Sequence, residues 1–265
     1  MIITLLTDFG LQDGYVGIMK GVIWGIAPGV QIADISHDVK AQDVLQGALA
    51  LRRAVPNFPA GTVHVAVVDP GVGTSRRALA GHLGGQYFVG PDNGLFSLAL
   101  ERAEAQAQAV EWVHLTRREY WLPQVSAVFH GRDIFAPVAA HLANGVPLSA
   151  LGEPVYDPVR LLFPQPKRTA GGWSAQVIHV DHFGNLATNL RQDQISPAQS
   201  IVIRIKDVEI QGIVQAYGMG LPGEMVALFD SSDMLAIAVV HGNAAQMLQA
   251  RIGDSVDVTC GTAVS

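Results

Sequence analysis

The stretch VAVVDPGVGTSRR, residues 65–77, places an apolar run directly before an Asp-Pro-Gly turn and a pair of arginines. Such a run predicts a buried strand of the kind found in parallel sheets. The loop that follows carries a carboxylate, Asp69, and a guanidinium, Arg76. A type II turn with Gly71 at its third position would explain Asp69 structurally. In α/β proteins, however, ligands also bind at the carboxyl ends of such strands.

Strand and helix signals alternate on both sides of this stretch. Buried-strand runs occur at 2–7, 30–36 and 62–69, and helical spacing of apolar residues occurs at 13–27 and 41–53. A hairpin around Gly84 and Gly85, a short helix from Asn93, a strand at 109–115 and a helix at 131–145 follow. This β-α-β order predicts an α/β fold with a mostly parallel sheet between two layers of helices.

The pattern of residues changes near residue 157. The segment DPVRLLFPQPKRTAGG, residues 157–172, combines prolines, basic residues and glycines without a helical or strand period. Beyond it come short strand-like runs and one late helix near 243–250. We therefore expect a smaller C-terminal β-barrel domain. The expected boundaries are an N-terminal α/β domain at 1–160, a linker at 161–172 and the β-barrel domain at 173–265.

Composition narrows the class of function. The chain has 265 residues, of which 49% are hydrophobic and 15% charged, and its formal net charge is -6. These values predict a globular protein without a nucleic-acid surface, so a small molecule is the expected partner. The single cysteine, Cys260, fits a reducing compartment. The apolar run at the amino terminus is too short for a membrane span or a signal peptide, and we expect a cytoplasmic protein.

Polar residues end several of the predicted strands. Asp8 ends the first strand in TDFG, Asp69 ends the third, and His130 precedes a helix in FHGRD. Each of them has a structural explanation as a turn or capping residue. In HVDHFGNLATNL, residues 179–190, the side chains of Asp181, Phe183 and Asn185 surround a glycine. A carboxylate, an aromatic face and an amide together suit an ammonium group and a flat heterocycle, although a β-turn with a core Phe is the alternative.

Several common site motifs are absent from the sequence. The glycine-rich loop at 69–77 lacks the lysine of a phosphate-binding loop and has too few glycines for a dinucleotide fingerprint. No GxSxG sequence marks a nucleophilic serine. A metal site is an open alternative, since hydrolases often use His and Asp ligands. Its candidate ligands are Asp8, Asp69, His130, His37 and His64, but no HxH, HExxH or DxD spacing supports it.

Seven motifs together resemble a known family. They are TDFG, ISHDV, VVDPGVGTSRR, VGPDNGLF, FHGRDIFAP, DHFGNLATN and HGNAA, which occur in this order from Thr7 to Ala245. In this combination the chain resembles the S-adenosylmethionine (SAM) hydroxide adenosyltransferases, the hydrolytic relatives of the fluorinases and chlorinases. The resemblance implies an α/β domain followed by a β-barrel, and homotrimers with active sites at subunit interfaces. It also implies that SAM is hydrolysed to adenosine and methionine without a metal or cofactor.

The resemblance assigns roles to individual residues. The family's catalytic Asp, Arg and His correspond to Asp69, Arg76 and His130. A sulfonium leaves readily, so such a site needs mainly an oriented water, which Asp69 and His130 would hold and deprotonate while Arg76 keeps Asp69 charged. The implied substrate-binding residues are Asp8 for the ribose hydroxyls, Asp181 for the methionine ammonium, Phe183 and Asn185 for the adenine, and Ser231 near the methionine end. Ser232 is an alternative to Ser231, because the family more often reads Asn-Ser there.

Three alternatives stay open. Halogenating relatives carry Tyr where this chain has Asp69 and His130, so both positions favour water over a halide; Gly131 excludes neither nucleophile. A non-catalytic module that senses SAM or adenosine would need Asp8 but would make no demand on Asp69. A metal-dependent hydrolase would lose its activity in chelator.

Overall fold

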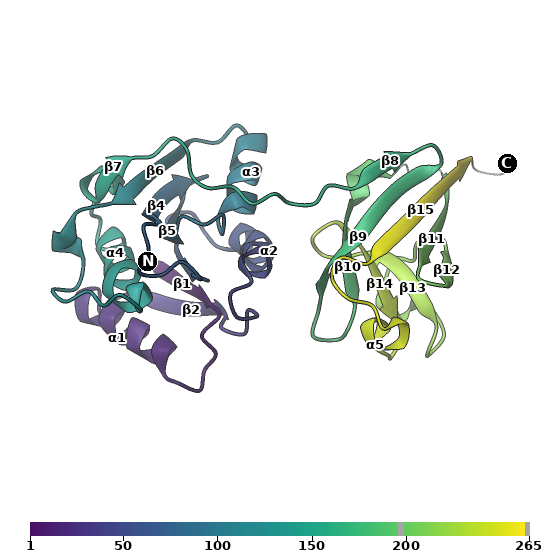
Figure 1. Ribbon diagram of the computed structural model, residues 1–265, viewed down its shortest axis with the longest axis horizontal. Coiled ribbons are helices and arrows are strands. Elements are labelled where there is room, and N and C mark those ends of the chain that lie inside the picture. The colour runs from purple at the N-terminus through teal and green to yellow at the C-terminus, as the bar shows by residue number, and fades with distance from the viewer. Residues whose placement is uncertain (196–198, 263–265) are drawn as a thin grey trace. The chain divides into compact units, whose positions relative to one another are not determined.

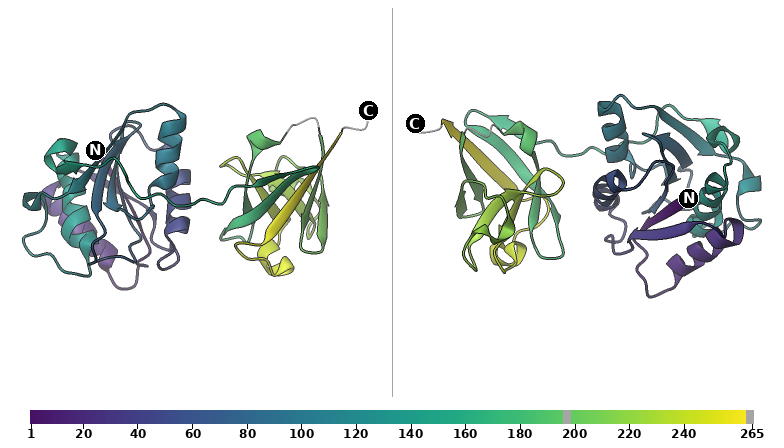
Figure 2. Two further views of the ribbon diagram at one scale, coloured as in Figure 1. Left: turned by 45° about the horizontal axis from the view of Figure 1, so that its top comes forward. Right: turned by 180° about the vertical axis from the view of Figure 1, so that it is seen from behind.

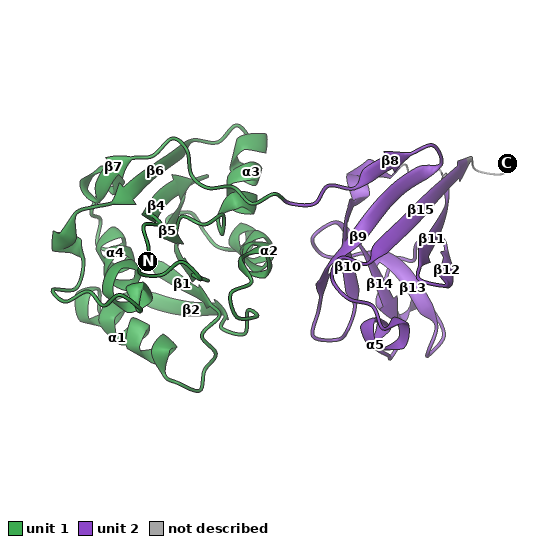
Figure 3. Cartoon of the chain, viewed as in Figure 1, with its two compact units in different colours: residues 1–162 green, residues 163–265 purple. Residues whose placement is uncertain are grey.

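Two compact units make up the chain. The computed structural model describes residues 1–195 and 199–262, and its units are Met1–Leu162 and Phe163–Ser265 (Figure 3). The segment 161–172, expected from the sequence as a linker, contains a short strand at Lys167–Thr169. The division of the chain into domains at 160 and 173 stays a prediction.

A seven-stranded mixed sheet forms the centre of the first unit (Figure 1). Its strands are β1 (Ile2–Thr7), β2 (Gln31–Ser36), β3 (Val63–Val67), β4 (Ala78–Leu83), β5 (Gln86–Pro91), β6 (Val110–Leu115) and β7 (Gly152–Pro154). Their order is β2-β1-β3-β5-β4-β6-β7. The neighbours among β2, β1, β3 and β5 are parallel, whereas β4 pairs antiparallel with both β5 and β6. The mostly parallel sheet is thus confirmed, as is the hairpin at Gly84 and Gly85.

Helices cover both faces of this sheet (Figure 2). The four helices are α1 (Tyr15–Ile26), α2 (Val44–Ala54), α3 (Ser97–Ala105) and α4 (Ala136–Ala143). Residues of α1 and α4 share one hydrophobic core with the sheet, and residues of α2 and α3 share another. Side chains of β3 alternate between the two cores: Val65 and Val67 join the first, and Ala66 joins the second. This period-two alternation explains why the run before Asp69 is apolar throughout.

The third helix begins later than its sequence predicts. Asn93, expected to begin it, instead donates its side-chain amide to the Val68 carbonyl oxygen at 2.8 Å and accepts from the Leu95 amide at 3.2 Å. These contacts keep residues 93–96 in a turn, and the helix starts at Ser97. An asparagine that bonds to nearby backbone favours turns over helix interiors.

The second unit is a nearly closed antiparallel barrel, which confirms the predicted smaller β domain. Its strands are β8 (Lys167–Thr169), β9 (Gly172–Val180), β10 (Leu186–Arg191), β11 (Gln199–Ile205), β12 (Val208–Gln211), β13 (Met225–Phe229), β14 (Met234–Val239) and β15 (Ser255–Thr262), with one helix, α5 (Ala244–Leu248). The strand order is β12-β11-β15-β9-β10-β14-β13, with β8 paired to β9. Strand β15 was not predicted, although Val256 and Val258 alternate into the barrel core. Within the described residues, no helix is long and apolar enough to span a bilayer.

A buried histidine lies at the centre of the first unit. His64 of β3 is fully buried, and its Nδ1 lies 2.8 Å from the hydroxyl of Thr4 on β1. The rings of Phe58 and Phe88 pack against it at 5.5 and 5.1 Å between centroids. Burial lowers the pKa of His64 from 6.5 to about 4. The folded protein therefore holds this imidazole in its neutral form at neutral pH.

We expect the free energy of unfolding to fall as the pH is lowered from 6.5 towards 4. In that range His64 is protonated in the unfolded chain but not in the folded one, so acid favours unfolding, by roughly 2 kcal/mol at about pH 5. Urea unfolding at pH 8 and pH 5 measures the effect. His64→Gln should reduce the pH dependence, whereas His82→Gln, at a partly exposed position of β4, should not. An unchanged slope in His64→Gln would contradict the assignment.

Candidate active site

The first two candidate carboxylates lie at one edge of the sheet. Strands β1 and β3 are parallel neighbours, with Thr7 opposite Val67 in their register. Asp8 and Asp69 each follow the end of one of these strands, at the sheet edge where open α/β proteins bind ligands. The fold therefore brings together two polar chain positions that are 61 residues apart in sequence (69 − 8).

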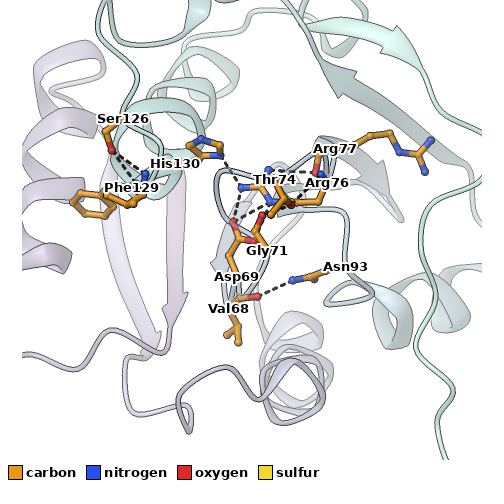
Figure 4. Close-up of polar contacts among 11 residues, drawn as sticks. Val68, Asp69, Gly71, Thr74, Arg76, Arg77, Asn93, Ser126, Phe129 and His130 are labelled. Atoms are coloured by element: carbon orange, nitrogen blue, oxygen red, sulfur yellow. Dashed lines mark hydrogen bonds and ion pairs between the residues drawn. The ribbon is translucent and has the colours of Figure 1, made fainter.

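Asp69 and Arg76 form a buried ion pair (Figure 4). The Arg76 Nε donates to both carboxylate oxygens of Asp69, at 2.9 and 3.0 Å, and its Nη2 donates to Oδ2. The two side chains are only 5% and 10% exposed, respectively. The guanidinium also lies 5.3 Å from the ring centroid of Phe135. Breaking such a buried pair leaves one charge uncompensated, which typically costs about 3–5 kcal/mol.

His130 completes this group. Its Nδ1 lies 2.8 Å from Nη2 of Arg76. A guanidinium can only donate, so Nδ1 is the acceptor and the neutral ring carries its proton on Nε2. Burial lowers the pKa of His130 from its ordinary 6.5, the charge of Arg76 lowers it further, and Asp69 and Asp133 offset this only in part. The arrangement therefore favours a neutral imidazole that presents an N–H group on its far side.

The loop after β3 is held by its own backbone. The Val72 amide donates to the Asp69 carbonyl at 3.2 Å, and the Thr74 hydroxyl donates to the Gly71 carbonyl at 2.6 Å. Gly71 does not have a positive φ, so the turn is not the type II turn that its sequence predicts. Instead the left-handed position is Gly73, with φ of 76°.

Gly73 also joins the two loops of the candidate site. A Cβ atom at this position would overlap the carbonyl oxygen of Ala127, in the loop that leads to His130. Both the backbone conformation and the close approach therefore require glycine here. The loop that carries Arg76 packs directly against the loop that carries its partner His130.

A buried carboxylate shapes the second loop. Asp133 has no exposed surface and accepts a hydrogen bond from the Ser126 amide at 2.8 Å. The Ser126 hydroxyl in turn accepts from the Phe129 amide at 3.0 Å. Residues Gly131–Phe135 form a π-helical turn that runs into α4. Such turns are rare and frequent at functional sites, and here the turn sets the direction of His130.

A hydrogen bond from a neighbouring loop holds the side chain of Asp8. Its Oδ2 accepts a hydrogen bond from the Gln42 amide at 2.7 Å. Phe9 contacts Phe129 edge to face, at 5.9 Å between centroids, which brings this loop beside His130. One carboxylate oxygen, Oδ1, stays available to a ligand hydroxyl.

The second unit contains a cavity of its own. Asp181 accepts hydrogen bonds at Oδ1 from the amides of Phe183 and Asn185, at 2.9 and 2.8 Å, and at Oδ2 from the Asn185 side chain, at 2.8 Å. A carboxylate has about four acceptor positions, so one remains on Oδ2. The bond from the Asn185 side chain to Asp181 Oδ2 also orients the Asn185 amide group, so that its Oδ1 can accept a hydrogen bond from a ligand.

An aromatic wall faces this cavity, whose volume is about 470 Å³. Phe183 is 71% exposed, so it is not the core residue of the alternative β-turn interpretation. The lining residues are Asp181, Phe183, Asn185, Tyr217, Gly218, Val239, Val240, His241 and Gly242. Tyr217 and His241 were missed from the sequence. The position of His241 in the HGNAA motif was the available signal for one of them.

Ser231 lies apart from this cavity. It is exposed in the turn after β13 and is not among the residues that line the cavity. Its neighbour Ser232 donates its amide to Asp230 Oδ1 at 2.8 Å. The choice between Ser231 and Ser232 therefore stays a prediction.

The candidate metal ligands do not form a cluster in the part of the chain that the structure describes, where no group of three or more His, Cys, Asp or Glu side chains has a suitable arrangement. His37 and His64 each have a threonine hydroxyl 2.8 Å from Nδ1.

Both units of the chain match models of one known protein family. Residues 3–152 match the SAM hydroxide adenosyltransferase N-terminal domain, and residues 175–257 match the C-terminal domain of the same family. An (R)-S-adenosyl-L-methionine hydrolase of Salinispora tropica is 44% identical over 264 residues, 98% of each chain. A protein of the same name from Thermus thermophilus is 40% identical over 252 residues, 94% of this chain and 95% of the relative.

More distant relatives and a solved structure agree with this match. A fluorinase of an Actinoplanes species is 30% identical over 224 residues, 74% of each chain. The crystal structure of an uncharacterized conserved protein from Thermotoga maritima superposes with a TM-score of 0.88 at 37% identity, covering 97% of this chain and all of the other.

Replacing Gly73 by alanine should loosen both loops of the candidate site. The new Cβ would strain a left-handed backbone and collide with the Ala127 carbonyl, at a cost of roughly 1–3 kcal/mol. Hydrogen–deuterium exchange should rise in peptides covering 70–76 and 125–130. Gly71→Ala is the matched control, because a Cβ there makes only ordinary contacts and φ is not positive. Equal exchange in the two variants would contradict this account.

Proposed function

Because this chain belongs to the SAM hydroxide adenosyltransferase family, we propose that it is an enzyme that hydrolyses S-adenosyl-L-methionine to adenosine and L-methionine. The observation that carries the proposal is the direct contact of Asp69, Arg76 and His130 at the carboxyl edge of the parallel sheet. A hydrolase that activates water needs polar groups held close together, and Arg76 joins the other two directly.

The reaction needs little besides a positioned water. The positively charged sulfur leaves the ribose 5'-carbon as a neutral thioether, so no general acid is required. Water forms the new bond to carbon, the carbon–sulfur bond breaks, and one proton leaves the water. Holding the water in line with the leaving sulfur can supply roughly 7–11 kcal/mol of the barrier.

The geometry favours a division of roles between Asp69 and His130. We expect Asp69 to accept the proton of the water, because its carboxylate has acceptor positions that Arg76 does not fill. His130 offers its Nε2–H to the water oxygen, since its other nitrogen accepts from Arg76. This differs from the sequence-based expectation that both residues draw on the proton. Arg76 bonds to both Asp69 and His130 and so fixes the orientation of both partners.

Substrate recognition is assigned to both units. Asp8 would accept from the ribose hydroxyls through Oδ1, and Asp181 would accept from the methionine ammonium at its remaining position on Oδ2. The exposed ring of Phe183 would stack on adenine, while Asn185 bonds to its polar edge. Tyr217 lines the same cavity and offers a second aromatic surface to the adenine. Ser231 is proposed near the methionine end on the resemblance alone.

We propose that the protein is cytoplasmic, uses no cofactor or metal, and assembles as a homotrimer in which the active sites lie at subunit interfaces. The resemblance to the family supports the trimer, and the single cysteine fits a reducing compartment. Light scattering should give three times the chain mass of 28.1 kDa. A monomer at working concentrations would remove this part of the proposal.

Turnover of SAM in oxygen-18 water should give adenosine labelled at its 5'-oxygen. Asp69→Ala should lower kcat by at least about 100-fold, because the water loses its proton acceptor. Mass spectrometry of the products measures the label. Reactions with chloride or chelator are the controls: a 5'-chloro product would indicate a halogenase, and loss of activity in chelator would indicate a metal enzyme. Tight SAM binding without turnover would indicate a sensor.

The value of kcat/KM should fall less between pH 7.5 and 6.5 than it would for a histidine with the ordinary pKa, and most of the fall should come at lower pH. The neutral form of His130 is the active one, and its lowered pKa places its protonation below the ordinary value of 6.5. His130→Gln, which retains a donor and an acceptor, should keep activity within about tenfold, whereas His130→Ala should lose about 100-fold or more. Equal losses in both variants would show that His130 takes up the proton.

A further inference from the structure

A chain of polar contacts lies behind the loop that carries Asp8. The hydroxyl of Thr7, the last residue of β1, lies 2.8 Å from Nδ1 of His37. The other ring nitrogen of His37 lies 3.1 Å from Asp34 Oδ1, and Lys20 Nζ lies 2.6 Å from Asp34 Oδ2. Thr7 is fully buried, and the His37 side chain is only 2% exposed. None of these four residues has a place in the site as described so far.

The donors and acceptors along this series of contacts favour one direction for the hydrogen bond between Thr7 and His37. The Phe9 amide donates to the Thr7 oxygen at 3.2 Å, so the Thr7 hydroxyl is free to donate its own hydrogen to His37 Nδ1. His37 then carries its proton on Nε2, which lies 3.1 Å from Asp34 Oδ1 but without the geometry of a hydrogen bond. Burial raises the pKa of Asp34, but Lys20 and His37 outweigh this and lower it overall. The Lys20 ammonium in turn donates to Asp34 Oδ2, so hydrogen bonds lie at both ends of this series and an electrostatic contact joins His37 to Asp34.

The backbone of His37 also holds the loop that carries Asp8. The Gly10 amide donates to the His37 carbonyl oxygen at 2.8 Å. Farther along that segment, the Gln42 amide donates to Asp8 Oδ2 at 2.7 Å. Residues on both sides of Asp8 are thus tied to the segment that begins at His37. A shift of His37 would move the carboxylate of Asp8 relative to the rest of the site.

We propose that His37 is a positioning residue for Asp8, acting through Thr7 and supported by Asp34 and Lys20. This inference rests on the proposed function, in which Asp8 binds the ribose hydroxyls of the substrate. His37 itself touches no reacting atom in this assignment. It holds the loop so that Asp8 Oδ1 faces the ligand without a rearrangement on binding, which is the usual benefit of preorganisation.

The protein contains a matched pair that separates positioning from simple stability. Thr4, on the same strand, places its hydroxyl 2.8 Å from Nδ1 of His64, as Thr7 does with His37. Thr4 and His64 are fully buried in the core of the first unit. In the described part of the chain, neither Thr4 nor His64 forms a side-chain hydrogen bond with residues 8–11. Loss of either threonine hydroxyl removes a bond to a buried histidine, and loss of the Thr7 hydroxyl also removes the acceptor of the Phe9 amide.

Thr7→Val and Thr4→Val test the proposal with kinetics. Both variants should lose thermal stability, and Thr7→Val should lose somewhat more because the bond from the Phe9 amide goes as well. Thr7→Val alone should raise KM for SAM about tenfold, which corresponds to about 1.4 kcal/mol, while kcat changes by less than about threefold. Thr7→Ser, which keeps the hydroxyl, should restore most of the affinity. An equal rise of KM in Thr7→Val and Thr4→Val, or no rise in either, would overturn the proposal.

Hydrogen–deuterium exchange tests the same inference without the substrate. Thr7→Val should speed exchange in peptides covering 8–11 and 38–43, and Thr4→Val should leave both peptides unchanged. If the wild-type protein does not turn over SAM, the proposed function fails, and this measurement still decides whether His37 positions the loop. Unchanged exchange in Thr7→Val would show that the chain of contacts does not hold Asp8.

Discussion

The Arg76 guanidinium is the constraint on which the candidate site depends. It can only donate hydrogen bonds, and it does so to Asp69 and His130 at once. One buried cation therefore orients a carboxylate and sets which nitrogen of an imidazole carries the proton. Much of the surrounding backbone serves this contact, because Gly73 and the π-helical turn at 131–135 bring the two loops together.

The sequence predicted the architecture well, because the signals for it are local. Apolar runs such as the one before Asp69 reflect burial on both faces of a strand, and this requirement acts on each residue separately. The turn after it was predicted less well: its left-handed residue is Gly73, and the reason is contact with Ala127, which is distant in sequence. Asn93 similarly bonds to Val68 of a neighbouring segment and delays the helix.

The site was predicted only as a set of motifs. Arg76 and His130 are 54 positions apart, and no spacing rule specifies that they touch. Tyr217 was missed because a single tyrosine in a glycine-rich loop carries no periodic signal. His37 was considered only as a metal ligand, because its structural partner Thr7 becomes a neighbour only through the pairing of β1 with β2.

The residues of the proposed chemistry and those proposed to recognise the base belong to different compact units. Asp69, Arg76 and His130 lie in the first, whereas Phe183 and Asn185 lie in the second. Selection on the nucleophile can therefore act on two loops of one unit while the cavity of the other, proposed to hold the nucleoside, is inherited intact. A duplicated gene would begin its divergence with substrate affinity already in place, and a few substitutions in those loops would be enough to explore a new reaction.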